Sequence, residues 1–584
     1  MLSGHISSSS VEVRFGYSFA PSPYRTVMLS HWWRRRTSMT EPTSLLPPAW
    51  VHKRDGRQAA FEADKICRAL FAATESLGRP DAFLARELTD GIVHFLTAEL
   101  DGAAPTTAQI AETVVKVVRE LGQPALAQAF AAGAERKDVE RAEVPPEEVG
   151  ALLSGKELRE VVRECVREYS LQTVFARDVV AAQADGLLTL TGLETPEDLA
   201  GCGAQRPAAG GWMEALVDAR ALAGEVAAVE GLEYALEAAA PEKRDVEGLA
   251  RDLELGRRAT GLSVVVNLNV ARPPSWADEL AAGPLFVAQR RSADLQRLAA
   301  HGDALLQTLI GACSVRVDWH LCERDFEPEW RERLVRAARW ATHGAMAFVF
   351  DRPRRPIALA EGMDRKHPAV LLSVGLHLVR LLDQPGVRHD SALFLQKVGS
   401  LARLALSAGV QKRDFLRSVA AGRPALTRGF LLDRARLVAV PIGLEEVVQA
   451  FTGASISDAG GTDMARRIVE RLREVLHTEG LARRLHVKLD SPVGGWQPSM
   501  GSVGLSAWNP TATVKNQLKA AGTLHAIAES GTASVCVPSE APPTAEQIAD
   551  WLQWAWQQTD LVRLRWGHAL AADRQLTLEM KGGG

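Results

Sequence analysis

The feature that most constrains the fold is the alternation of short apolar runs with helical patterns after residue 150. Runs typical of buried strands stand at residues 187–190, 264–268, 345–350 and 371–378. Stretches with helical periodicity lie at residues 155–185, 208–255, 391–408, 444–451 and 462–479. Strands that alternate with helices over about 400 residues predict an α/β fold built on one large sheet or barrel.

A different pattern comes first, between residues 49 and 140. Asp55-Gly56 separates two short extended runs, which is a strong signal for a β-hairpin. Helical periodicity begins at Glu62 and recurs at residues 80–99, 107–121 and 124–137, and Thr106 or Thr107 can cap the third helix. We therefore expect a β-hairpin followed by four helices.

Proline-rich and charged segments divide the chain into regions. Residues 1–48 hold four consecutive serines and a Trp-Trp-Arg-Arg-Arg run and end in Pro47-Pro48, so we expect a disordered tail and linker there. A charged stretch around Pro145-Pro146 separates a domain at residues 49–140 from a body at residues 150–575, and residues 576–584 form a tail.

Charge balance and cysteine spacing exclude several classes of protein. The formal net charge is -3, from 68 basic and 71 acidic residues, which gives no global attraction to nucleic acid or to an anionic membrane. None of the six cysteines forms a C-x-x-C pair, which argues against a zinc ribbon or an iron–sulfur cluster. The low number of cysteines is consistent with a reducing cytoplasm. No apolar stretch approaches the roughly 18 residues that a membrane span needs. We expect a cytoplasmic protein without metal, nucleic-acid or membrane ligands.

Any anionic ligand must then be held by a local cluster, and the region 49–140 supplies one. A triphosphate needs several cationic donors that converge from different elements. The cationic candidates are Lys53 and Arg54 on the first hairpin strand, Lys65 in the first helix, and Arg136 and Lys137 at the end of the last helix. Val51 and Ile66 can pack against an adenine ring, and Thr107 can form a hydrogen bond with a base edge or a phosphate.

These residues stand in motifs that resemble the ATP-cone, a domain found at the N-terminus of many ribonucleotide reductases and in the repressor of their genes. The motifs are Val51-His52-Lys53-Arg54-Asp55-Gly56, Asp64-Lys65-Ile66, the Thr-x-x-Ile start at Thr107, and the alanine-rich helix that closes at Lys137. The resemblance implies that ATP or dATP is an allosteric ligand. By the same resemblance its contacts are Val51, His52, Lys53, Arg54, Lys65, Ile66 and Thr107. Ala59 and Ala132-Gly133 depart from the family pattern, which predicts weaker binding or a relaxed base preference.

The body resembles, more faintly, the anaerobic class III, glycyl-radical ribonucleoside-triphosphate reductases. Residues 175–193 are similar to a helix and the first barrel strand of that family, and Glu361-Gly362-Met363-Asp364-Arg365 is similar to its finger loop. Residues 440–453 are similar to a Gly-Leu-x-Glu…Thr-Gly segment shared by reductases, and residues 523–527 to part of a late strand. The resemblance implies a ribonucleotide-reductase-like α/β barrel.

The chemistry of that family is missing from the chain. Met363 or Asp364 takes the place of the finger-loop cysteine, and the C-terminus has neither the four-cysteine zinc site nor the Arg-x-x-Gly-Tyr of a glycyl radical. Methionine has no S–H bond from which a thiyl radical can form. Cys313 and Cys322 flank His320, but their spacing matches no zinc pattern. We therefore predict no catalytic and no metal-binding residues.

Three functions remain open at this point. The leading hypothesis is an ATP- or dATP-binding regulatory protein with a catalytically degenerate reductase-like body, which acts as a homo-oligomer through its ATP-cone or on an active reductase subunit. The second is a divergent reductase subunit that relies on a partner for its radical, with Cys202 and either Cys313 or Cys322 as its redox pair. The third, a nucleotide-sensing transcriptional regulator, lacks the zinc ribbon of that family.

Overall fold

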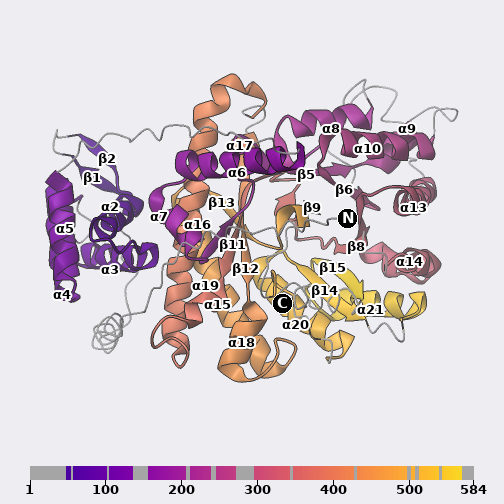
Figure 1. Cartoon of the computed structure of the whole chain (residues 1–584). Coiled ribbons are helices and arrows are strands. Elements are labelled where there is room, and N and C mark those ends of the chain that lie inside the picture. Colours follow the sequence, from indigo (N-terminus) through magenta and orange to yellow (C-terminus); the bar gives the residue numbers. More distant parts are fainter. Residues whose placement is uncertain are drawn as a thin grey trace, which may run out of the picture.

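The computed structural model describes residues 48–53, 57–100, 104–135, 155–204, 211–238, 245–270, 295–341, 346–426, 431–495, 502–506, 509, 512–537 and 542–568. They form an N-terminal domain, residues 48–135, and a larger body from residue 155 onward (Figure 1). The expected tails at 1–47 and 576–584, the linker at Pro145-Pro146, and three predicted site residues, Arg54, Arg136 and Lys137, lie outside the described residues. Within the described ranges, no helix is long and apolar enough to cross a membrane.

The N-terminal domain is a β-hairpin followed by four helices, as predicted. Strands β1 (Trp50–His52) and β2 (Gln58–Ala60) pair antiparallel. The helices are α2 (Ala63–Ser76), α3 (Ala82–Leu100), α4 (Thr107–Glu120) and α5 (Pro124–Glu135). Of the two candidate caps for α4, Thr106 is the one used: its hydroxyl accepts from the backbone of Gln109, whose side chain accepts from the Thr106 backbone.

The body is built on one large sheet, in which eleven strands are described. The spatial order is β13-β12-β11-β4-β5-β6-β7-β8-β15-β14, and β3 pairs with β11 off this path. The strands are β3 (Leu188–Leu190), β4 (Leu199–Gly203), β5 (Ala223–Glu230), β6 (Ser263–Leu268), β7 (Arg316–Leu321), β8 (Met346–Phe350), β11 (Ala369–His377), β12 (Arg436–Ile442), β13 (His486–Leu489), β14 (Thr532–Val537) and β15 (Arg563–His568).

The sheet consists of two parallel sets that run in opposite directions. Strands β4 to β8 are parallel to one another, and the direction reverses at the antiparallel pairs β4–β11 and β8–β15. The two edge strands, β13 and β14, lie close together: the Ser530 hydroxyl before β14 donates a hydrogen bond to the carbonyl of Leu489 in β13. Lys488 and Glu529 stand 4.0 Å apart at the same junction. The sheet therefore curves into the expected α/β barrel.

Helices cover the outside of this barrel (Figure 1). They are α6 (Gly155–Val174), α7 (Arg177–Ala184), α8 (Trp212–Arg220), α9 (Leu232–Ala238), α10 (Val246–Thr260), α13 (Leu295–Ala312), α14 (Arg331–Ala338), α15 (Leu378–Leu382), α16 (Ser391–Val419), α17 (Leu431–Arg434), α18 (Leu444–Thr452), α19 (Ala459–Ala482), α20 (Val514–Ala528) and α21 (Ala545–Gln558), with short 3₁₀ turns η2 (Glu323–Phe326), η3 (Pro328–Trp330), η4 (Ala420–Gly422), η5 (Pro424–Leu426) and η7 (Val493–Gly495). Alternate strand residues serve two cores: Ala227 and Val229 pack toward the helices, whereas Val226 and Ala228 pack inside the barrel.

An inner hairpin, residues 358–364, reaches into the barrel. It consists of β9 (Ala358–Ala360) and β10 (Met363–Asp364), joined at a tip formed by Glu361 and Gly362. Leu359 and Met363 belong to the apolar core inside the barrel, and the Leu359 carbonyl accepts from the Asn267 amide at 3.0 Å. The finger-loop resemblance thus falls on a true hairpin within the barrel.

Two sequence interpretations were wrong in detail. Residues 208–255 read as helices, but Ala223–Glu230 is the central strand β5. Its alanines favour a helix locally, but β5 pairs with β4 and β6, and its two faces are buried against the outer helices and the core inside the barrel, where small side chains fit. Residues 523–527, expected in a late strand, lie in α20.

Candidate functional site

The predicted nucleotide site lies where the hairpin of the N-terminal domain meets two helix starts. The backbone N–H of His52 donates to the carbonyl of Pro105 at 2.9 Å, which places β1 beside the first turn of α4 and Thr107. The N–H of Phe61 donates to Ala49 at 3.0 Å, which holds the hairpin to the start of α2. The structure therefore brings Val51, His52, Lys53 and Thr107 together around one corner.

The first turn of α2 contributes Lys65 and Ile66 to this domain. The Lys65 side chain is 58% exposed and its ammonium lies 2.9 Å from Glu62, so it is held only by a surface ion pair. Lys53 is exposed as well, whereas Val51 and Ile66 are buried. His52 lies 3.4 Å from the Gln58 side chain across the hairpin, a contact that occupies its ring nitrogen. The nucleotide roles of these residues stay predictions.

A cluster of buried charges surrounds the tip of the inner hairpin. The Glu361 carboxylate accepts from Arg316 and Arg565, each at 2.8 Å, and Arg563 lies 3.7 Å away. Asp318 completes the cluster, with Arg316 at 2.9 Å and Arg563 at 3.0 Å. Three arginines thus face two carboxylates inside the barrel, at the position that resembles the finger loop.

The electrostatics of this cluster hold Glu361 ionised. Burial alone pushes the pKa of Glu361 up, but the charges of Arg316, Arg565 and Arg563 outweigh it and lower the pKa to about 2. Asp490 lies next to the cluster and accepts from the backbone N–H of Gly362 at 2.8 Å. Burial raises the pKa of Asp490 above its ordinary value. The hairpin tip is therefore fixed by ionic and backbone contacts.

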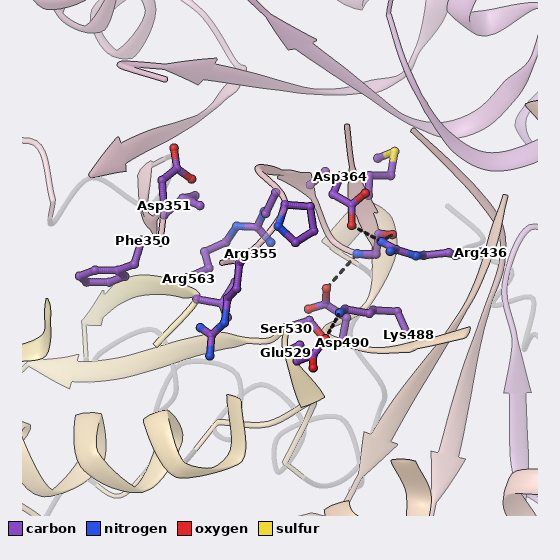
Figure 2. Close-up of a pocket in the computed structure, with 17 residues that line it drawn as sticks. Phe350, Asp351, Arg355, Asp364, Arg436, Lys488, Asp490, Glu529, Ser530 and Arg563 are labelled. Carbon is purple, nitrogen blue, oxygen red and sulfur yellow. Dashed lines mark hydrogen bonds and ion pairs between the residues drawn. The ribbon is translucent and has the colours of Figure 1, made fainter. Parts of the chain in front are cut away.

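A narrow cleft lies between the inner hairpin, strands β8, β12, β13 and β15, and residues 529–530 before β14. Figure 2 shows that several charged side chains on its wall point toward one another. Arg436 donates to Asp364 at 2.6 Å, and the Arg355 guanidinium donates to the Asp560 carbonyl at 2.8 Å. The cationic groups on this wall are thus largely engaged by acceptors of the protein itself.

His320 stands at the end of β7 in a closed polar network. Its Nδ1 lies 2.9 Å from Asp351, and its Nε2 lies 2.9 Å from the Asn267 side-chain oxygen. Cys322, two residues on, contacts Asp325 at the start of η2, and burial raises its pKa to about 11. In the part of the chain that the structure describes, no group of three potential metal ligands comes together.

The cysteines proposed for a redox pair contact two different helices outside the sheet. The Cys202 thiol is buried on β4 and lies 3.7 Å from the carbonyl of Ala219, in helix α8 outside the sheet. Cys313 lies 3.4 Å from the carbonyl of Ala250 in α10. Burial raises the pKa of Cys202 to about 12 and also raises that of Cys313. Both thiols are protonated near neutral pH, a form that is a poor nucleophile.

Sequence reasoning missed the charge cluster in the barrel. A signal for it was present, because Arg316 and Asp318 in β7, and Arg563 and Arg565 in β15, are spaced by two and alternate with apolar residues. A spacing of two places both side chains on one face of a strand. Such charges on a strand of a fully covered sheet predict an inward ionic cluster.

Comparisons with known proteins agree with both halves of this description. A family model described as ATP cone domain matches residues 50–138. A solved anaerobic ribonucleotide reductase superposes with a TM-score of 0.54 at 11% identity, covering 70% of this chain and 78% of its own. The anaerobic ribonucleotide reductase from Thermotoga maritima with citrate in the active site gives 0.54 at 11% identity, with coverage of 71% and 91%. The same enzyme with dATP bound in the specificity site gives 0.53 at 11% identity, with coverage of 70% and 84%.

A search of curated proteins gives no match. The family model covers the N-terminal domain, and the structural likeness, at 11% identity, concerns the fold alone. The chain thus carries an ATP-cone domain at residues 50–138 and, after it, a body with the fold of the anaerobic ribonucleotide reductases.

Proposed function

We propose that the chain is an ATP- or dATP-binding regulatory protein whose reductase-fold body carries out no radical chemistry of its own. The observation that supports nucleotide binding is the arrangement of the N-terminal domain. Lys53 is exposed at the end of β1, which is bonded to the segment before α4 and Thr107, and Lys65 is exposed in the first turn of α2, the helix that follows the hairpin. Ammonium groups held only by surface contacts can turn to a triphosphate at small cost.

The body supports the second half of the proposal. Residues 361–364 at the end of the inner hairpin hold no thiol, and the carboxylate of Glu361 is engaged by three arginines. A thiyl radical needs an S–H group at that position, which neither a carboxylate nor a thioether supplies. The fold can persist without the chemistry, because function depends on the site and not on the scaffold.

The test is a calorimetric titration of the full chain with ATP, dATP and GTP. We expect ATP and dATP to bind and GTP to bind much more weakly. The variant Lys53→Met with Lys65→Met should lose at least 30-fold in ATP affinity, because a hydrogen bond from a charged donor contributes about 1.5–3 kcal/mol. Sedimentation velocity at the same nucleotide concentrations reports whether binding changes self-association.

The matched control removes two charges from the other end of α4, in Lys116→Met with Arg119→Met. Both residues are exposed, so the control loses the same net charge from the same domain. Its ATP affinity should stay within twofold of the wild type. If both double variants lost ATP affinity equally, the loss would follow from the change in net charge and not from contacts of Lys53 and Lys65. Absence of ATP binding by the wild-type chain would refute the proposal of a nucleotide sensor.

A further inference from the structure

The N-terminal domain is docked on its own body through α3 and α16. Glu87 of α3 lies 2.6 Å from the Lys397 ammonium, whose side chain is only 2% exposed. Asp90, one turn further along α3, accepts from Ser400 and from Arg403, each at 2.7 Å. Figure 1 shows the domain lying against this long helix. Partly buried, charge-assisted bonds of this length fix one orientation of the two parts.

A second contact joins α2 and α3 to the body at α7 and α19. Arg86 is fully buried, and its guanidinium lies 2.9 Å from Asp64 and 4.0 Å from Asp178 of α7. The Cys67 thiol lies 3.6 Å from the same Asp178 carboxylate. Arg483, at the end of α19, lies 4.0 Å from Asp64. The start of α2 is thus tied to the body on one side.

The four residues Asp64-Lys65-Ile66-Cys67 serve both parts of the molecule. Asp64 and Cys67 contact the network around Asp178, whereas Lys65 points to solvent from the same helical turn. This turn has no side-chain cap, because Glu62 at the N-cap makes no capping hydrogen bond. An uncapped helix start frays unless tertiary contacts hold it. Within the domain the turn is held by Arg86 of α3 and by the backbone bond between Phe61 and Ala49. From the body it is contacted by Asp178 and Arg483.

We propose that docking on the body holds the first turn of α2 in its nucleotide-binding form, so that nucleotide affinity and docking of the N-terminal domain are coupled. The inference rests on the proposed nucleotide site and adds its means of communication with the body. Coupling is reciprocal: if docking strengthens ATP binding, ATP strengthens docking by the same factor. The signal then acts within one chain, through α7, α16 and α19.

The test is the variant Asp178→Asn, which alters a body residue outside the nucleotide site. We expect the Kd for ATP to rise 3- to 10-fold. Hydrogen–deuterium exchange of amides 63–67 should be faster in the variant before any nucleotide is added, and ATP should slow exchange in α7 of the wild type. The matched control is Asp303→Asn, which also removes a carboxylate from an arginine pair, on α13 at the far side of the body. It should change neither quantity.

Arg483→Met gives a second route if the first variant does not fold, since this side chain is 20% exposed and tolerates replacement better. An unchanged Kd and unchanged exchange in a folded variant would overturn the coupling while leaving the nucleotide sensor intact. Absence of ATP binding by the wild type would instead refute the sensor, and the exchange of amides 63–67 would still report whether the body holds this turn.

Discussion

In the N-terminal domain, Lys53 after β1 and Lys65 in the first turn of α2 are both exposed, and Lys65 makes a surface ion pair with Glu62. In the barrel, Glu361, Asp318 and Arg563 are buried, Arg316 and Arg565 are 18% and 29% exposed, and each arginine already faces a carboxylate of the same chain. The two regions hold similar side chains in opposite conditions of solvation and pairing.

Solvation and pairing decide which region can respond to a ligand. An exposed lysine exchanges water and a weak partner for a phosphate at little cost, because a surface pair contributes about 0–1 kcal/mol. A buried, paired arginine must leave a carboxylate uncompensated before it can bind anything else, which costs about 3–5 kcal/mol. The N-terminal domain is therefore suited to ligand exchange, and the barrel cluster to holding the inner hairpin in place.

The largest effect is expected from Glu361→Gln. This variant leaves Arg316, Arg563 and Arg565 without the carboxylate that they share, so the free energy of unfolding should fall by about 3–5 kcal/mol. Urea unfolding followed by tryptophan fluorescence measures it. The control Glu529→Gln, with a 57% exposed side chain, should change stability by less than about 1 kcal/mol. A loss below about 1 kcal/mol in Glu361→Gln would show that the cluster is not what fixes the hairpin.

The same residue predicts a dependence on pH. Because the pKa of Glu361 is lowered to about 2 in the folded chain, its contribution is present above the ordinary pKa of 4.5 and is lost as pH falls from 4.5 toward 2. Unfolding free energies measured across this window should therefore fall less steeply in Glu361→Gln than in the wild type. Equal slopes in the two proteins would contradict the assignment.

Gly362→Ala tests the hairpin tip by shape instead of charge. Gly362 has φ of +70°, and an added Cβ would lie 2.2 Å from a methyl carbon of Val438. Strain and overlap together should destabilise the fold by about 2–4 kcal/mol, measured by thermal and urea unfolding. Gly311→Ala is the control, since nothing lies within 4 Å of its Cβ and alanine favours a helix. Equal stability of both variants would mean that the tip can move freely.

A second dependence on pH is expected from His525, which is buried in α20. Burial, aided by Arg355 and Arg563, lowers its pKa to about 3, and its Nδ1 accepts from the backbone N–H of Val562 at 3.2 Å. The unfolded chain takes up a proton below pH 6.5 and the folded chain does not, so stability falls as pH drops from 6.5 toward 3. The slope is on the order of 1.4 kcal/mol per pH unit. A His525→Gln variant should lose this part of the slope, and an unchanged slope would contradict it.

Local patterns predicted the fold where the local signal and the tertiary environment agree. The hairpin and four helices of the N-terminal domain, and strands β6, β8 and β11 of the body, have the spacing that their burial requires. Strand β5 was not predicted, because its alanines favour a helix and only its place between β4 and β6 makes it a strand. Residues 523–527 were wrongly expected in a strand; they lie within α20, which begins well upstream, after the N-cap Thr513.

The two sites differ in the same way. Lys53, Lys65 and Thr107 lie in motifs within one small domain, so the sequence could propose them as a group. The barrel cluster joins β7, the inner hairpin and β15, whose residues Asp318, Glu361 and Arg563 meet only after the sheet has formed. Long-range register of this kind is not encoded in any local pattern, although the two-residue spacing of charges in β7 and β15 indicates which side chains face inward.

The smallest effect on stability is expected from Lys65→Met, which tests most directly whether the exposed lysines differ from the charge cluster in the barrel. Its partner Glu62 is 48% exposed and lies three residues before it, at the N-cap of α2, so the free energy of unfolding should change by less than about 0.5 kcal/mol. Urea unfolding measures this change, and calorimetry of the same sample should show an ATP affinity reduced about tenfold or more. A residue that matters for the ligand and hardly for the fold is what distinguishes a binding charge from a structural one. If stability fell by as much as in Glu361→Gln, Lys65 would be structural, and the contrast between the two regions would not hold.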